Sequence, residues 1–424
     1  MEGYYSRIAD KELKIRLESS GAVLVQGAKW CGKTTTAKNL ARSVLFMQDP
    51  NRVSENLQTA AIYPTRLLEG DTPRLIDEWQ MAPNLWDAVR FVVDERGKMG
   101  QFILTGSAVP VDTGVIHHSG VGRISRLLMR PMTLYESKES NGQVSLGELF
   151  SGAKSIEGKS DLSFEDLAFA ICRGGWPQAV VCAKEVALRQ AYDYYDGVVE
   201  LDMPRLDGVE RNSSRLRRLM RAYARHMGSQ SKYSELINDM AANDSGILSN
   251  VTVTNYVDAL KKIFVIEDSP AWNVNLRSKT AIRTTDTRYF VDPSIGVAAL
   301  RIGPGDLLND LNTMGIMFEN LCVRDLRVFA GANDGEVYHY RDANGLECDA
   351  VIHLHNGKYG LVEIKLGGAE NIETAAKTLN KLADKIDTAK MGEPAFKMVL
   401  VGAGEYAYTR LDGIHIVPIG CLKP

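Results

Sequence analysis

The sequence predicts an α/β protein of three segments, and three observations support this fold class. The chain has 424 residues, more than one hydrophobic core usually organises. Near the N-terminus an apolar strand leads through a glycine-rich loop into a helix, and the C-terminal third alternates helix, three strands, helix and strand. We place the segments at residues 1–140, 141–300 and 301–424.

The composition is that of a folded globular protein. Apolar residues make up 45% and charged residues 24%, which excludes disordered and collagen-like chains. The formal net charge is −3, so any basic surface for nucleic acid must be local. No run approaches the about 18 apolar residues of a membrane helix, and the N-terminus lacks a signal-peptide core. We expect a cytoplasmic protein with no membrane partner, whose six scattered cysteines are reduced thiols.

A phosphate-binding motif follows the first apolar strand. Residues 27–34 read Gly-Ala-Lys-Trp-Cys-Gly-Lys-Thr, and helix-forming residues come next. The spacing G-x-x-x-x-G-K-T between a strand and a helix is a P-loop, whose backbone N–H groups cradle phosphates. Lys33 is expected to reach the β- and γ-phosphates of ATP, and the Thr34 hydroxyl to bind Mg²⁺. The predicted nucleotide-binding residues of this motif are Gly27, Lys29, Gly32, Lys33, Thr34 and Thr35.

Two later strands end in polar side chains that suit the same site. One ends in Asp77, expected to hold Mg²⁺ through water, and Glu78, expected to polarise the attacking water. The other spans residues 101–107, and either Thr105 or Ser107 is a candidate sensor of the γ-phosphate. An ordinary cap after a strand is the alternative for these two hydroxyls.

Arg123 and Arg126 follow a glycine-rich loop and are candidates for an arginine that stabilises phosphate charge. Such an arginine acts either within its own chain or on a neighbouring copy. The second case would require a homo-oligomer that assembles through this domain. An ordinary surface role is the alternative.

The order of these motifs resembles the prokaryotic AAA-type ATPases that carry a C-terminal domain of unknown function. The resemblance rests on residues 27–34, 75–78, 104–107, 122–123 and 132–136, and later on 173–177 and 288–293. It implies an AAA-type ATPase domain, then a helical lid, and a C-terminal domain that resembles the restriction-endonuclease-like fold.

A basic helix is predicted in the middle segment. Residues 212–232 contain no acid, and helical spacing separates an apolar face from a basic one. The apolar face carries Leu216, Leu219, Met220, Tyr223 and Met227, and the basic face carries Arg217, Arg218, Arg221 and Arg225. We predict that this basic face binds DNA phosphates or an acidic partner. A solvated helix whose arginines pair with acids elsewhere is the alternative.

The next stretch has the layout of a winged helix. Helices are expected over residues 233–240 and 249–262, with a turn at 243–246 between them and a strand starting at Ile263. Polar residues at the start of the second helix are placed to reach DNA. A lid or a protein-contact module is an equal alternative.

The C-terminal segment reads as αβββαβ and carries a second candidate active site. Asp349 lies on one strand, and Glu363 and Lys365 share one face of the next. This constellation is that of the restriction-endonuclease-like superfamily. The resemblance implies that Asp349 and Glu363, with Glu319, bind Mg²⁺ and that Lys365 orients or activates the attacking water. Glu-x-Lys is also a frequent accident on surface strands.

These patterns together predict Mg²⁺-dependent ATP binding and hydrolysis coupled to action on DNA, with a metal-dependent nuclease site in the C-terminal segment. The alternative is an ATP-gated protein-interaction switch whose C-terminal domain is a catalytically silent scaffold.

Overall fold

The computed structural model describes residues 4–107, 119–205, 211–242, 249–273 and 285–424. The chain divides into two compact units. The first unit consists of Met1–Pro131, Pro204–Val209 and Ala259–Phe264, and the second of Met132–Met203, Glu210–Asp258 and Val265–Pro424. We describe each unit by itself.

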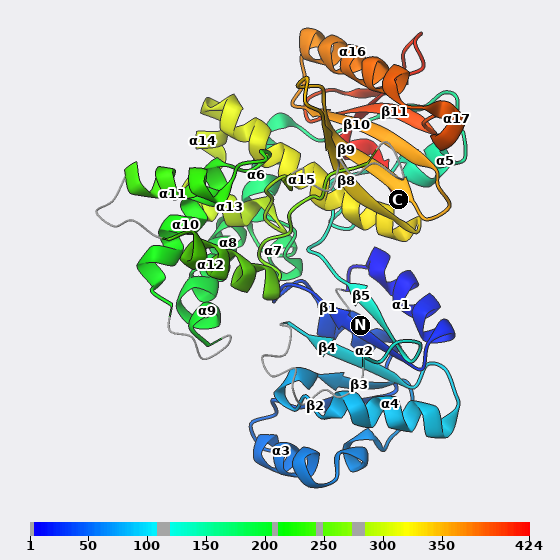
Figure 1. Ribbon diagram of the computed structural model, residues 1–424, viewed down its shortest axis with the longest axis vertical. Helices are drawn as coiled ribbons and strands as arrows, with labels where there is room; N and C mark the ends of the chain where they lie inside the picture. Colours follow the sequence, from blue (N-terminus) through cyan, green and yellow to red (C-terminus); the bar gives the residue numbers. More distant parts are fainter. Residues whose placement is uncertain (1–3, 108–118, 206–210, 243–248, 274–284) are drawn as a thin grey trace. The chain divides into compact units, whose positions relative to one another are not determined.

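Five parallel strands form the sheet of the first unit (Figure 1). Across the sheet the strands are β2 Ser43–Phe46, β3 Arg74–Asp77, β4 Phe102–Gly106, β1 Ala22–Gln26 and β5 Ile124–Leu128. β4 lies between β1 and β3, and its register pairs Gly106 with Gln26 and Thr105 with Asp77. The P-loop begins at the carboxyl end of β1, and Asp77 lies at the carboxyl end of β3. Only β4 separates these two strand ends.

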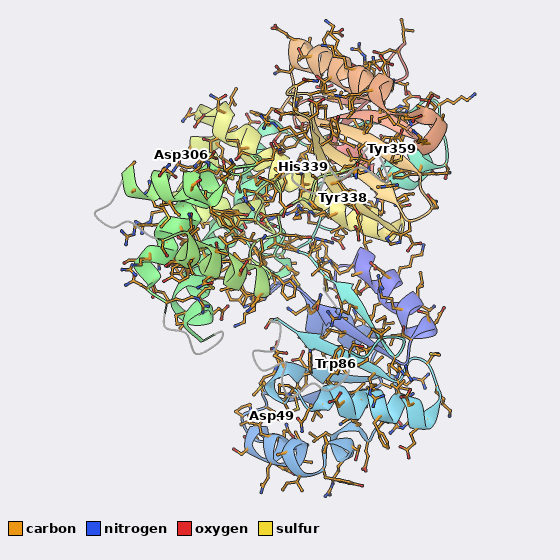
Figure 2. All side chains as sticks on the ribbon, in the orientation of Figure 1. Asp49, Trp86, Asp306, Tyr338, His339 and Tyr359 are labelled. Carbon is orange, nitrogen blue, oxygen red and sulfur yellow. The ribbon has the colours of Figure 1, made fainter. Side chains whose placement is uncertain are left out.

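Helices cover both faces of this sheet. α1 Ile8–Ser19 and α2 Lys33–Leu40 contribute to a core with Val23 and Val25 on one face. α4 Leu85–Arg96 packs on the other face, where Trp86 (labelled in Figure 2) meets the core that includes Ala22 and Leu24. Alternate residues of β1 thus point to opposite cores, as the pleat requires. The remaining elements are α3 Val53–Ile62 and the 3-10 helices η1 Pro64–Leu68 and η2 Trp79–Met81.

A seven-stranded mixed sheet organises the C-terminal part of the second unit. Across it the strands are β7 Glu157–Lys159, β12 Tyr406–Thr409, β13 His415–Pro418, β11 Phe396–Val401, β10 Tyr359–Lys365, β9 Glu347–Leu354 and β8 Gly335–Arg341. The helices are α15 Leu311–Ala332, α16 Ala369–Lys385 and α17 Thr388–Met391. The predicted αβββαβ order, from α15 to β11, is confirmed. Tyr359, labelled in Figure 2, lies in the core shared with α16.

The two units differ from the three predicted segments. β7 comes from the predicted middle segment but pairs with β12. β6 Val144–Ser145 likewise pairs with β14 Leu422–Lys423, the last strand of the chain. Strand pairing therefore joins residues on both sides of the expected boundary at 300/301, and Met132 already belongs to the second unit.

The rest of the second unit is helical. Its elements are α5 Leu146–Phe150, α6 Phe164–Arg173, α7 Pro177–Val180, α8 Lys184–Gly197, the π-helix η4 Val198–Asp202, α10 Ser213–Arg225, α11 Tyr233–Ala242, α13 Pro293–Leu300 and α14 Pro304–Asn309. α9 Met203–Arg205 and α12 Asn250–Lys262 extend into residues assigned to the first unit, and the 3-10 helix η6 Ile419–Cys421 precedes the final strand. α13 is buried on nearly every side, which fits its almost entirely apolar sequence.

The predicted winged-helix segment is confirmed in its helices and not in its first strand. α11 and α12 match the two expected helices, while the expected turn at 243–246 lies outside the described residues. The strand expected from Ile263 is wrong, because Phe264 has a left-handed backbone (φ 57°) that turns the chain after α12. Beyond it, Ile266 bridges Phe290 and Ser269 bridges Thr287, both antiparallel. The winged-helix assignment itself stays a prediction.

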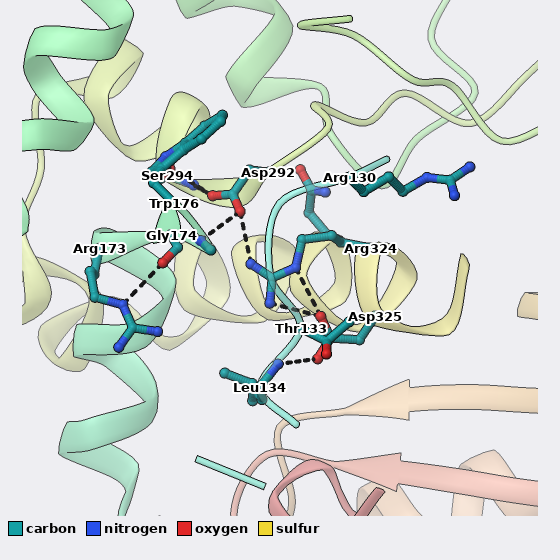
Figure 3. A network of polar contacts seen from close by, with 12 residues as sticks. Arg130, Thr133, Leu134, Arg173, Gly174, Trp176, Asp292, Ser294, Arg324 and Asp325 are labelled. Carbon is teal, nitrogen blue, oxygen red and sulfur yellow. Dashed lines mark hydrogen bonds and ion pairs between the residues drawn. The ribbon is translucent and has the colours of Figure 1, made fainter. Parts of the chain in front are cut away.

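A buried ionic network holds the second unit together where the motifs at 173–177 and 288–293 meet (Figure 3). Arg324, 1% exposed, pairs with Asp292 at 2.8 Å and with Asp325 at 2.7 Å. Asp292 also accepts the backbone N–H of Gly175, and Asp325 that of Leu134. Each buried carboxylate therefore has both a cationic and a backbone partner, as a charge in a dry core requires.

None of the helices among the described residues is both long enough and apolar enough to cross a bilayer. All six cysteines are free thiols, as predicted.

Candidate active sites

The phosphate-binding loop connects β1 to α2, as predicted. Gly27 (φ 149°) and Gly32 (φ 100°) adopt backbone angles that favour glycine, and a Cβ on Gly27 would lie 2.0 Å from the Met129 carbonyl oxygen. The Lys33 ammonium donates to the carbonyl oxygens of Gly27 at 3.0 Å and Ala28 at 2.7 Å. The Lys33 ammonium thus lies over the loop that is expected to bind phosphate.

Asp77 is the meeting point of three elements. Its Oδ1 accepts hydrogen bonds from the Thr34 hydroxyl at 2.7 Å and the Thr105 hydroxyl at 2.6 Å, and its Oδ2 accepts from Gln48 Nε2 at 2.7 Å. Thr34 and Asp77, both predicted to bind Mg²⁺, are therefore in direct contact. Hydroxyl and carboxylate oxygens are the hard ligands that Mg²⁺ prefers, so these residues fit the ion. Gln48 was missed, although its position just after β2 places it at the same edge of the sheet.

Glu78 follows β3 in a left-handed conformation (φ 56°). Its Oε2 accepts hydrogen bonds from Gln80 Nε2 and, at 3.4 Å, from the Ser107 hydroxyl. The two candidate sensor hydroxyls therefore have different partners. Thr105 contacts Asp77, the candidate metal ligand, and Ser107 contacts Glu78, the candidate catalytic residue. Gln80 was missed, because a glutamine in a 3-10 turn carries no motif.

Lys29 and Thr35 are both exposed, one on the loop and one on the first turn of α2. Their side chains are accessible to a ligand from solvent, whereas Lys33 is 6% exposed. The six residues that the sequence assigned to the loop, together with Asp77, all belong to the first unit.

Arg123 does not reach this site within its own chain. It precedes β5 and its carbonyl accepts the N–H of Ala22, the first residue of β1, so it lies at the amino edge of the parallel sheet. The P-loop is at the carboxyl edge, a strand length of about 16 Å away. Arg123 Nε instead donates to Asp94 at 2.8 Å, and both side chains are exposed. The expectation of an arginine acting in cis is wrong for Arg123, and its action on a neighbouring copy stays a prediction.

The second candidate site brings together Asp349, Glu363 and Lys365. The register of β9 and β10, with Leu361 opposite Val351, places Glu363 beside Asp349. The Lys365 ammonium pairs with Asp349 Oδ2 at 2.9 Å and Glu363 Oε2 at 2.8 Å. The backbone N–H of Ile364 also donates to Asp349, at 2.7 Å. The predicted constellation therefore exists as a lysine bridging two carboxylates.

Electrostatics of this cluster depend on burial. Burial and the charge of Asp349 raise the pKa of Glu319 and of Glu363 well above the ordinary value of a glutamate. Burial alone would lower the pKa of Lys365, but Asp349 and Glu363 outweigh it and raise the pKa. The two carboxylates thus favour the charged form of Lys365. Glu319 accepts a hydrogen bond from the Tyr289 hydroxyl at 2.5 Å.

A pocket of about 600 Å³ is lined by Asp349, Glu363 and Lys365. Thr374, Thr378 and Lys381 of α16 form another part of its wall, and sequence reasoning missed them because their helix carries no motif. No three metal-binding side chains converge as a preformed metal site in the part of the chain that the structure describes. The expected set of Asp349, Glu363 and Glu319 is therefore not assembled, because the Lys365 ammonium lies between two of its members.

One oxygen nevertheless lacks a partner. Glu363 is 4% exposed, and its Oε1 has no hydrogen-bond partner among the described residues. A buried carboxylate oxygen without a partner is costly, so a ligand that enters the pocket would be favoured there. A hard cation has the chemistry to satisfy it.

The basic helix α10 has the predicted faces, because Leu216, Leu219, Met220 and Tyr223 are buried. Two of the four arginines are neutralised, however. Arg217 pairs with Asp196 at 2.7 Å and Glu200 at 2.8 Å.

Arg225 pairs with Asp239 of α11, also at 2.7 Å. Arg218 donates to the Ser214 carbonyl, and Arg221 is exposed. The alternative of arginines paired with acids elsewhere is thus confirmed for Arg217 and Arg225.

Comparison with known proteins supports the assignment of the first unit. Residues 19–138 match a family model described as an AAA domain, and this range contains every residue of the first candidate site. The match supports an AAA-type P-loop ATPase domain at residues 19–138. Residues 164–306 and 314–422 match two models described as domains of unknown function, DUF8612 and DUF4143.

The chain is also similar to two uncharacterized proteins, Mb2031c of Mycobacterium bovis and Rv2008c of Mycobacterium tuberculosis. Each is 22% identical over 416 residues, which cover 97% of this chain and 83% of the relative. Among solved structures, the Walker-type ATPase PABY2304 of Pyrococcus abyssi matches with a TM-score of 0.44 at 16% identity, covering 70% of this chain and 96% of that one.

Proposed function

We propose that the first unit hydrolyses ATP with Mg²⁺ and that this reaction is coupled to action on DNA by the second unit. The observation that carries the ATPase site is the contact of Asp77 Oδ1 with both Thr34 and Thr105. Side chains of α2 and β4 thereby meet at one oxygen of the last residue of β3. Mg²⁺, when bound, would supply positive charge to the β- and γ-phosphates.

The side chains around that oxygen have distinct tasks in this proposal. Lys33 moves from the carbonyls of Gly27 and Ala28 to the phosphates and neutralises their charge. Asp77 and Thr34, which are in contact, would hold Mg²⁺. Glu78, held by Gln80 and Ser107, polarises the attacking water.

Replacing Lys33 with alanine tests the nucleotide site. We expect ATP affinity to fall about tenfold to a hundredfold, since a hydrogen bond from a charged group contributes roughly 1.5–3 kcal/mol. A fluorescent ATP analogue titrated with the full chain measures this. Lys38→Ala, on the exposed part of the same helix, is the control and should bind as the wild type does. Equal affinities of Lys33→Ala and wild type would contradict the site.

For the second unit we propose metal-dependent hydrolysis of phosphodiester bonds. The observation in its favour is the unpartnered Oε1 of Glu363 in the pocket beside Asp349 and Lys365. In this proposal Asp349 and Glu363 would hold the metal, which would activate the scissile phosphate, and Lys365 would orient the attacking water. The ATP-gated switch with a silent scaffold remains the second candidate, favoured by the lysine that bridges the two carboxylates.

We propose that the basic face of α10 contacts DNA phosphates through Arg218 and Arg221. Changing Arg218 and Arg221 together to glutamine should weaken DNA binding and flatten its salt dependence by roughly one unit of slope per lost phosphate contact. Fluorescence anisotropy over a range of salt concentrations measures the slope. Arg217→Gln, which loses ion pairs to Asp196 and Glu200, should leave the slope unchanged. An unchanged slope in the double variant would exclude this face as a DNA contact.

A further inference from the structure

The buried side chain of Arg7 forms hydrogen bonds to two segments of the main chain that are far apart in sequence. It lies just before α1 and is 6% exposed. Its Nη1 donates to the Cys31 carbonyl oxygen at 2.7 Å, and its Nη2 donates to the Arg130 carbonyl oxygen at 2.8 Å. One acceptor belongs to the P-loop and the other to the segment after β5. A buried guanidinium thus bridges the back of the phosphate-binding loop to the end of the sheet.

The orientation of the loop follows from the first of these bonds. In a planar trans peptide the carbonyl of one residue and the N–H of the next point in opposite directions. Holding the Cys31 carbonyl on Arg7 therefore directs the Gly32 N–H away from Arg7. Gly32 is the N-cap of α2, and its N–H is one of those that cradle phosphate in a P-loop.

The same loop is enclosed on its other side. The Cys31 thiol donates to the Met129 carbonyl oxygen at 3.4 Å, and Gly27 packs so closely on that oxygen that no Cβ would fit. Two successive carbonyl groups therefore hold the loop. The Met129 carbonyl packs directly on it, and the Arg130 carbonyl holds it through Arg7. Without Arg7, the Cys31 and Arg130 carbonyl oxygens would lose a charged donor.

Neighbouring contacts fix Arg7 itself. Asp10 accepts the backbone N–H of Arg7 at 2.8 Å and the Tyr4 hydroxyl at 2.6 Å. The Tyr4 oxygen is also 3.0 Å from the Thr36 hydroxyl of α2. The segment before α1 thus contacts the P-loop through Arg7 and the P-loop helix through Tyr4.

We propose that Arg7 is a positioning residue of the ATP site, which keeps the P-loop in the conformation that receives phosphates. The proposal rests on the proposed ATPase function of the first unit. Arg7 acts on the ATP site through the peptide between Cys31 and Gly32. Its loss should therefore act on nucleotide affinity, whereas ATP that has bound can itself order the loop and leave the chemical step nearly intact.

The test is Arg7→Ala in the full chain, with steady-state ATP turnover as the readout. We expect KM for ATP to rise about tenfold to a hundredfold while kcat stays within about threefold. Guanidinium chloride at about 20 mM should lower KM in this variant and leave the wild-type KM unchanged, because the free ion can occupy the vacated position. The matched control is Arg16→Ala on the same helix, whose partner Glu12 is partly exposed and whose KM should not change.

The outcomes separate this proposal from the ATPase function. A folded wild type without ATP turnover would refute the function and not the role of Arg7. A wild-type KM in folded Arg7→Ala, or a fall in kcat alone, would overturn the positioning role. If Arg7→Ala does not fold, Arg7→Lys decides: it keeps the charge but loses the two-pronged fork, so we expect an intermediate KM, and a wild-type KM would overturn the proposal.

Discussion

Glu78→Gln is expected to lower kcat for ATP hydrolysis by about 10²- to 10⁴-fold while ATP affinity stays within about twofold. The amide has the shape of the carboxylate but cannot accept the proton of the attacking water. Its carbonyl oxygen can still accept from Gln80 and Ser107, so the side chain should keep its place. ATP binding depends on Lys33 and the loop, which the substitution does not touch.

Two measurements check this expectation. Phosphate release gives kcat, and analysis of the bound nucleotide shows whether the variant retains unhydrolysed ATP. Glu69→Gln changes an exposed carboxylate of the same unit and should leave both quantities unchanged. Turnover by Glu78→Gln at the wild-type rate would show that another group acts on the water.

Asp349→Asn is expected to abolish both metal binding and DNA cleavage in the second unit. If Mn²⁺ or Mg²⁺ binds at Asp349 and Glu363, it should raise the melting temperature of the wild type by about 5–10 °C at about 100 times its Kd. The variant should lose this protection and, with it, at least about 10²-fold of any cleavage rate. Asp342→Asn at the rim of the same pocket, where Asp342 pairs with Lys385, is the control.

Protection by metal should also depend on pH. The folded chain keeps protons on Glu319 and Glu363 at pH values where unfolded glutamates, with a pKa near about 4.3, have released them. The folded state then binds more protons than the unfolded state, so these groups make stability fall as pH rises toward their raised pKa. A metal ion replaces those protons, and its protection should be larger at pH 9 than at pH 6.

The variant Lys365→Ala distinguishes the nuclease proposal from the proposal of a catalytically silent scaffold. Removing the bridging ammonium leaves the buried Asp349 and Glu363 without their cationic partner, so the metal-free variant should be less stable and bind metal at least as tightly as the wild type. Cleavage of single- or double-stranded DNA should still be lost. If the wild-type chain shows neither protection by metal nor cleavage with Mn²⁺, the ATP-gated switch becomes the better account.

The sequence was sufficient to predict that the P-loop and Asp77 lie at one edge of the sheet, because parallel strands bring their carboxyl ends there. Thr34 and Asp77 are far apart in the chain, yet one lies just beyond the end of β1 and the other ends β3, and the two side chains are in contact. The same rule could have corrected Arg123, which precedes its strand and so belongs to the opposite edge. Gln48 and Gln80 could not be distinguished from surface glutamines, because their role depends on side-chain direction.

Other features depend on partners that no local pattern shows. The acid-free window around Arg217 and Arg225 is local in sequence, while the acids that neutralise them come from α8, η4 and α11. Glu363 and Lys365 were predicted to share a face, and they do, but the place of the ammonium between two carboxylates depends on the β9–β10 register. Arg7 left no signal because its acceptors are backbone carbonyls, which every residue has.

The decisive measurement is phosphate release from ATP by the full chain, first with Mg²⁺ and then after EDTA, with and without DNA. We predict steady turnover with Mg²⁺, its loss in EDTA, and a faster rate when DNA is present. Folded wild-type protein that releases no phosphate with Mg²⁺, or that releases it equally after EDTA, would contradict Mg²⁺-dependent hydrolysis at the site of Lys33, Asp77 and Glu78.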